Sequence, residues 1–201
     1  MKTNYELRYA AHPKDAKNYD TARLREDFLI QNLFVDNEVN MVYSMYDRLI
    51  VGGAKPVGET LVLEAIDPLK ATHFLSRREI GIFNVGGAGR VKVDGKTFDL
   101  DFKEALYLGC GDRTVSFESV DAAKPAKFYF NSAPAHRNCP DKKVTKADAI
   151  VAEMGSLEGS NHRNINKMLV CQVVETCQLQ MGMTELQPGS IWNTMPAHTH
   201  S

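Results

Sequence analysis

Residues 89–100 decide the fold, and they read GRVKVDGKTFDL. Two runs of alternating apolar and polar residues are joined there by Asp94 and Gly95. An Asp-Gly pair between such runs is a preferred two-residue hairpin turn, because glycine adopts a positive φ at little cost. The alternation predicts an antiparallel hairpin with one apolar face, made by Val91, Val93, Phe98 and Leu100.

Short β-favouring runs recur on both sides of this hairpin, at a spacing of roughly ten residues with turn residues between them. Before it and after it, we predict strands at residues 40–46, 48–51, 60–64, 79–85, 105–108, 114–117 and 127–130. Two later runs, at residues 168–174 and 176–183, continue the series. Such spacing is typical of a sandwich or barrel of antiparallel strands, so we predict an all-β fold.

Two further features are predicted elsewhere in the sequence: a short helix near the N-terminus and a boundary between two domains. Thr21 can cap a helix in which Leu24 and Phe28 lie on one face. Residues 141–159 are charged and rich in turn residues, which suggests a connector that carries a short helix. We place a domain boundary near residue 155, giving an N-terminal domain of residues 1–155 and a second block of residues 156–201.

The composition excludes several classes of protein. A chain of 201 residues that is 43% hydrophobic can bury a core, as one large domain or two small ones. The 24 basic and 25 acidic residues give a net charge of −1, so no basic excess is present to attract a nucleic acid. No apolar run approaches the roughly 18 residues that a membrane span requires. The first residues lack the apolar core of a signal peptide, so we expect a cytoplasmic protein.

The four cysteines show no C-x-x-C spacing, which argues against a thiolate zinc site or a redox pair. In the cytoplasm we expect them to stay thiols. We expect Cys171 and Cys177 in particular to be small core residues on or near strands.

The candidate metal-binding residues lie within residues 187–200, QPGSIWNTMPAHTH. Pro188 and Gly189 predict a turn that leads into a strand. Alternate residues of a strand share a face, so His198 and His200 would project the same way, roughly 7 Å apart along the backbone. Two such imidazoles can occupy two coordination positions of one divalent metal ion. An H-x-H near a chain end is also common in solvated tails. The residues before this one are apolar and conformationally restricted, which favours the interpretation that the two histidines form half of a metal site.

Polar residues near the strands that lead to this pair allow two interpretations. Asn161, Arg163 and Lys167 are either an ordinary solvated edge or a cationic anchor for an acidic substrate. Such polar and charged groups usually stay exposed, which favours the solvated edge. The alternative is that arginine grips a carboxylate of the substrate through two hydrogen bonds. On a regular strand Thr194 would share the metal-facing side with Trp192, so Thr194 is a candidate for orienting substrate or ligand.

Several segments together resemble a known family. They are EIGI at 79–82, the Asp94-Gly95 hairpin, PAKFY at 125–129, APAH at 133–136, ETCQL at 175–179, MGMTEL at 181–186 and WNTMPAHTH at 192–200. The chain closely resembles the 5-keto-4-deoxyuronate isomerases, also called 4-deoxy-L-threo-5-hexosulose-uronate ketol-isomerases, from its first residues to Ser201.

The resemblance implies a bicupin, with two jelly-roll barrels in one chain, assembled as a homohexamer with one zinc ion per full-length chain. In that family the C-terminal barrel holds zinc through two histidines of an H-T-H segment, a later glutamate and a more distant third histidine. His198 and His200 match the first two. We expect the chain to be part of a longer one in which the glutamate and the third histidine follow, so that residues 156–201 begin the second barrel.

The implied reaction is an aldose–ketose isomerisation in pectin and uronate catabolism. It converts 5-dehydro-4-deoxy-D-glucuronate, a small keto-uronate, to 3-deoxy-D-glycero-2,5-hexodiulosonate. The sequence does not identify the general base. Two alternatives remain open: a non-catalytic sugar-binding or regulatory cupin without metal, and an oxygenase, because histidines and a carboxylate also hold iron.

Overall fold

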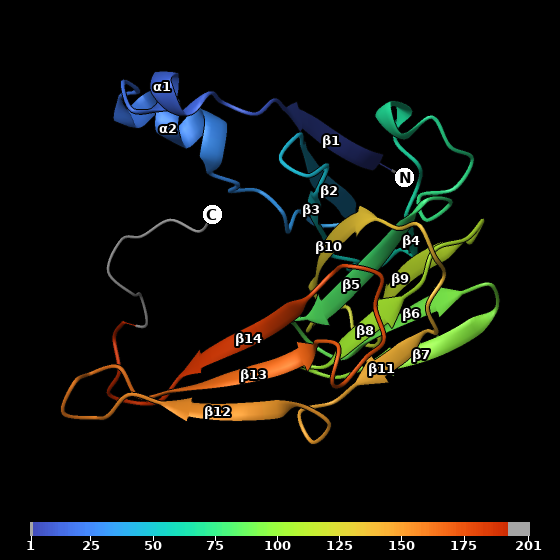
Figure 1. The fold of residues 1–201 in the computed structure, drawn as a ribbon. Coiled ribbons are helices and arrows are strands. Elements are labelled where there is room, and N and C mark those ends of the chain that lie inside the picture. The colour runs from blue at the N-terminus through green and yellow to red at the C-terminus, as the bar shows by residue number, and fades with distance from the viewer. Residues whose placement is uncertain (1, 193–201) are drawn as a thin grey trace.

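The computed structural model describes residues 2–192, which are built mainly from strands (Figure 1). The all-β prediction is confirmed. In chain order the elements are β1 Lys2–Arg8, α1 Pro13–Ala16, α2 Thr21–Phe28, β2 Glu38–Ser44, β3 Ile50–Ala54, β4 Leu61–Val62, a 3₁₀ turn Asp67–Leu69, β5 Arg78–Asn84, β6 Gly89–Val93, β7 Lys96–Leu100, β8 Ala105–Leu108, β9 Val115–Ser119, β10 Phe128–Pro134, β11 Lys142–Val144, β12 Ile150–Met154, β13 Arg163–Leu169 and β14 Met181–Leu186.

Two sheets enclose the main core, and we call them together the first barrel. One has seven strands in the order β1-β2-β3-β10-β5-β8-β11, and the other has four in the order β4-β9-β6-β7. Aromatic side chains bridge the two sheets: the ring of Phe117 on β9 lies 5.2 Å from that of Phe128 and 6.3 Å from that of Phe130, both on β10. All three rings are fully buried, so apolar contact holds the sheets face to face.

The hairpin forms as predicted. β6 and β7 pair antiparallel with Val91 opposite Phe98 and Val93 opposite Lys96. Asp94 and Gly95 between them have φ values of 49° and 85°, the two positive values that a type I′ turn requires. The predicted apolar face is buried in the main core.

The N-terminal segment contains a strand that the sequence pattern did not reveal. β1 pairs in parallel with β2 at the edge of the seven-stranded sheet. It is polar, and the side chain of Asn4 donates to those of Glu38 and Asn40 at 2.9 Å. The predicted helix also forms, although Asp20 rather than Thr21 is its N-cap. Leu24 and Phe28 remain about half exposed.

A third sheet, β12-β13-β14, projects away from the first barrel (Figure 1). The predicted short helix within residues 141–159 is wrong, because the β-favouring run at Ile150–Met154 forms β12 and pairs with β13. The change of sheet falls between β11 and β12, whereas the division of the chain near residue 155 stays a prediction.

The third sheet and the first barrel share a second buried cluster. It combines barrel residues such as Phe83 and Tyr107 with Leu169 at the end of β13, Met181 at the start of β14 and Leu179 from the loop between them. The predicted strands at 168–174 and 176–183 form only at their outer ends, because residues 170–180 are a loop. The loop still buries Val174 and Leu179, so its apolar residues reflect packing rather than a strand.

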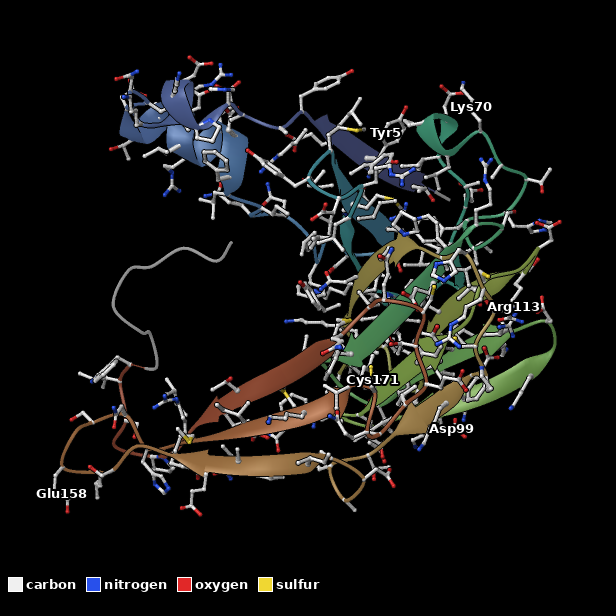
Figure 2. All side chains as sticks on the ribbon, viewed as in Figure 1. Tyr5, Lys70, Asp99, Arg113, Glu158 and Cys171 are labelled. Atoms are coloured by element: carbon white, nitrogen blue, oxygen red, sulfur yellow. The ribbon has the colours of Figure 1, made fainter. Side chains whose placement is uncertain are left out.

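The two cysteines of this loop differ from expectation. Cys171 is exposed, so the prediction that it is a core residue is wrong, and Cys177 is only partly buried. Figure 2 shows Cys171 close to the place where β13 meets the first barrel. All four cysteines are free thiols.

The tight junction between β5 and the third sheet predicts a stability effect at Gly81. A Cβ atom there would lie 2.7 Å from Cδ1 of Leu169 and would also clash with Sδ of Met181. We expect Gly81→Val to lower the free energy of unfolding by about 1–3 kcal/mol through overpacking. At Gly58 an added Cβ atom would meet no atom within 4 Å beyond the adjacent residues of the chain, so Gly58→Val is the control. Equal urea midpoints for the two variants would contradict this packing argument.

Candidate functional site

β13 carries both predicted substrate-binding cations on one face. Arg163 and Lys167 are four residues apart, so alternation puts their side chains on the same side, with about 13 Å between their Cα atoms. Arg163 is half-buried, and its Nη1 donates to the carbonyl of Asn161 at 2.9 Å. Lys167 is exposed. The structure therefore places the two cations on one surface without bringing their charged groups into contact.

Apolar side chains occupy the same face between and beside these cations. Met154 on β12 pairs with Arg163, and Ile150 pairs with Lys167. Leu186 on β14 pairs with Arg163 from the other side. The side chains of Ile150, Met154 and Leu186 are 43–46% exposed. We call this surface the β13 face: an apolar strip with a cation toward each end.

The opposite face of the third sheet is tied to the first barrel by charged groups. Glu185 on β14 accepts from Nζ of Lys103 at 2.7 Å and from Nζ of Lys146 at 2.9 Å. Hydrogen bonds from these two lysines lower the pKa of Glu185 below its usual value. Buried Asn166 on β13 donates to Glu185 at 3.1 Å. Because these contacts turn one face toward the barrel, the β13 face points away from it.

A buried carboxylate fixes the loop that leads into β14. Glu79 on β5 is fully buried and accepts from the hydroxyl of Tyr107 at 2.6 Å. It also accepts from the backbone N–H groups of Cys177, Gln178 and Leu179 at 2.7–2.8 Å. Burial and the hydrogen bond to Glu79 raise the pKa of Tyr107 far above its usual value. Sequence reasoning missed this pair, although a glutamate directly before the apolar run at residues 80–83 was a visible signal.

The segment that leads to the histidine pair is anchored to the β12–β13 connection. The backbone N–H of Gln187 donates to His162 O, and that of Ile191 donates to Ser160 O, both at 2.9 Å. The indole of Trp192 donates to Gly159 O at 3.0 Å. The anchored residues run near the far tip of the third sheet, where Figure 2 labels Glu158.

The turn at Pro188 and Gly189 is confirmed, with a φ of +88° at Gly189. A strand was predicted after this turn, but residues 190–192, the last that the structure describes, are not part of a strand. His198, His200 and Thr194 lie outside the described residues, so their assigned roles stay predictions. Within residues 2–192 no group of three or more His, Cys, Asp or Glu side chains is arranged to hold a metal ion. In that same range no helix is long and apolar enough to cross a membrane.

Comparison with known proteins identifies the family. The model of the KduI/IolB family matches residues 28–201. The chain belongs to the KduI/IolB family. Among its relatives, 4-deoxy-L-threo-5-hexosulose-uronate ketol-isomerase 1 of Bacteroides thetaiotaomicron is 78% identical over 201 residues, which are all of this chain and 72% of the relative. The ketol-isomerase of Formosa agariphila is 56% identical over the same shares of the two chains.

Comparison with solved structures returned two further bacterial proteins among its matches. An IolB-like protein from Salmonella typhimurium LT2 is 17% identical, with 64% of this chain and 46% of that chain covered at a TM-score of 0.47. A cupin protein from Bacteroides fragilis is 16% identical, with 44% and 65% covered at a TM-score of 0.32.

The Glu79 contacts predict how firmly the loop is held in this member of the KduI/IolB family. We expect Tyr107→Phe to lower the free energy of unfolding by about 1.5–3 kcal/mol, because a hydrogen bond to a carboxylate is lost. Glu79→Gln should cost more, since its amide cannot accept from all four donors at once. Tyr9→Phe is the control, because Tyr9 is 76% exposed. Chemical unfolding that finds Glu79→Gln as stable as the parent would refute the role of this carboxylate.

Proposed function

We propose that this protein is a uronate ketol-isomerase that converts 5-dehydro-4-deoxy-D-glucuronate to 3-deoxy-D-glycero-2,5-hexodiulosonate. The observation that carries the proposal is the 78% identity, over every residue of this chain, to a protein named as that ketol-isomerase. The family match over residues 28–201 supports it independently of any single relative. The reaction belongs to pectin and uronate catabolism.

The β13 face supports the binding of such a substrate. A hexuronate has one carboxylate, a polar chain of hydroxyl groups and an apolar carbon skeleton. Arg163 can pair with the carboxylate through two hydrogen bonds. Lys167, about 13 Å away along the strand, is too far to grip the same oxygen atoms without both side chains bending inward. We therefore assign Arg163 to the carboxylate and Lys167 to oxygen atoms at the other end of the substrate.

The histidine pair supports a zinc site. Neutral imidazoles are among the preferred ligands of zinc, and His198 and His200 supply two of them within three residues. A later glutamate and a third histidine of the second barrel would complete the ligand set. Bound zinc would supply Lewis-acid polarisation of the substrate's carbonyl oxygen. Thr194 would orient the substrate or a ligand from the same segment. The bicupin architecture, the hexamer and the cytoplasmic location belong to the same proposal.

The isomerisation requires a hydrogen to move between two adjacent carbon atoms. A general base must therefore lie within hydrogen-bond reach of the carbon-bound proton. Arg163 and Lys167 are cations at neutral pH, which suits them to binding an anionic substrate rather than to removing a proton.

The zinc assignment predicts the effect of two single substitutions. In the full-length protein, His198→Ala and His200→Ala should each reduce bound zinc well below about one ion per chain, because each removes one of four expected ligands. Isomerase activity should fall in parallel. Inductively coupled plasma mass spectrometry measures the metal, and His12→Ala is the control, since His12 caps helix α1 at the other end of the chain.

Two outcomes would replace the proposal by its rivals. A parent protein that binds keto-uronate but contains no metal and gives no turnover would favour a sugar-binding cupin. Turnover that stops under anaerobic conditions and consumes oxygen would favour an oxygenase. Unchanged zinc in both histidine variants would remove the ligand assignment alone.

The β13 face makes a separate kinetic prediction. Arg163→Ala and Lys167→Ala should each raise KM for the keto-uronate by roughly tenfold, equivalent to about 1.4 kcal/mol of binding free energy. Zinc content should not change. Arg90→Ala is the matched control, since Arg90 lies on β6 and pairs with Asp99. Parent-like KM values in both variants would show that these cations form only a solvated edge.

A further inference from the structure

A second cationic site lies at one end of the first barrel, away from the β13 face. A cavity of about 580 Å³ opens where β2 ends and β5 begins, beside the end of β10. Arg48, Arg77, Arg78 and His136 line it, together with apolar residues that include Leu69 and Phe74, and no aspartate or glutamate is among the lining residues. The cavity therefore gathers three positive charges without a negative one.

Arg78 provides the strongest argument that the cavity awaits an anion. The residue is only 5% exposed. Its guanidinium donates to Oγ of Ser132 at 3.0 Å, and to the carbonyls of Ser132 and Arg48 at 2.7 Å each. All three acceptors are neutral, and the ring of Tyr43 lies 5.5 Å from the guanidinium carbon. Within residues 2–192, no carboxylate forms an ion pair with Arg78.

Burial of this kind is costly for a cation. Removal from water lowers the pKa of Arg78 to about 10, so the guanidinium still carries its charge near neutral pH. A buried charge that lacks a counter-charge is strongly unfavourable unless a partner neutralises it. An anion in the cavity would supply that partner.

Arg48 and Arg77 extend the positive charge to the mouth of the cavity, where both are exposed. Arg77 donates to the carbonyls of Leu69 and Lys70, and among the residues that the structure describes no carboxylate forms an ion pair with it. Asp47 and Arg48 both have positive φ, at 52° and 53°, so a tight turn presents Arg48. Asp47 lines the adjoining cavity, and in the described part of the chain it forms no ion pair with Arg48.

We propose that this cavity binds an oxyanion carried by a hexose-sized molecule, either the carboxylate of a hexuronate or the phosphate of a sugar phosphate. Its volume lies within the range of roughly 300–1,000 Å³ that is usual for small-ligand sites, and it is too large for a lone inorganic anion. The planar guanidinium groups match carboxylate and phosphate oxygens in pairs. Leu69 and Phe74 offer apolar contact to the sugar carbons. This site is separate from the β13 face and does not depend on the isomerase assignment.

Isothermal titration calorimetry at low salt tests the proposal on the full-length protein carrying both His198→Ala and His200→Ala. The probes are D-galacturonate, glucose 6-phosphate, inorganic phosphate and uncharged D-galactose. We expect at least one of the two anionic sugars to bind. Tighter binding of D-galacturonate would identify the oxyanion as a carboxylate, and tighter binding of glucose 6-phosphate would identify it as a phosphate. Galactose should not bind, and inorganic phosphate should bind more weakly than the better sugar.

Substitutions then locate the binding. Arg48→Ala and Arg77→Ala should each weaken the preferred anionic sugar about tenfold, since each removes a charge from the mouth. Both residues are exposed, so neither change should prevent folding. Arg90→Ala is the matched control outside the cavity, since Arg90 pairs with Asp99, and it should leave affinity unchanged. The proposal is overturned if neither anionic sugar binds, if inorganic phosphate binds equally tightly, or if Arg48→Ala and Arg77→Ala bind like the parent.

Discussion

The buried carboxylate of Glu79 is the contact on which the arrangement of this molecule depends. It sits on β5, between β10 and β8 in the first barrel's larger sheet, and receives four hydrogen bonds. Three of the donors are consecutive backbone N–H groups of the loop before β14. A loop cannot bury its backbone unless such groups find partners. One side chain thus satisfies the loop and fastens the third sheet to the barrel.

Two further contacts fix the orientation of that sheet. Met181 and Leu169 pack over Gly81, where a larger residue would not fit. Glu185 pairs with Lys103 from the connection between β7 and β8 and with Lys146 from the connection between β11 and β12. Apolar packing brings the sheet close, and the ion pairs decide which of its faces turns inward. The outward face is consequently the one that carries Arg163 and Lys167.

The molecule thus has two separate cationic surfaces of different character. On the β13 face the cations are spread along an apolar strip and at least one is exposed to water. At the end of the first barrel they surround a cavity, and the central arginine is buried with neutral partners only. Desolvated charge interacts more strongly with an anion than exposed charge does. An anion is therefore expected to be held more strongly by the buried arginine of the cavity than by the exposed cations of the β13 face.

The functional residues differ in how far their sequence revealed them. Arg163 and Lys167 could be proposed as candidates because they are basic residues close to predicted strands that lead toward the histidine pair. Glu79, Tyr107 and the three arginines of the cavity are far apart in sequence or lie at strand ends, and no local periodicity connects them. Their contacts exist only after β2, β5, β8 and β10 have assembled. Cys171 shows the reverse case, since an apolar neighbourhood in the sequence did not bury it.

The sequence by itself determined the all-β class, the hairpin at Asp94 and Gly95, helix α2 and the membership of a uronate isomerase-like family, because each follows from local periodicity, turn chemistry or extended similarity. Only the tertiary structure decided that the polar segment at residues 2–8 is an edge strand, that residues 150–154 form a strand rather than a helix, and that residues 170–180 form a loop that buries Val174 and Leu179. Pairing with a neighbouring strand and burial against a distant sheet set those outcomes, and both depend on residues remote in the chain.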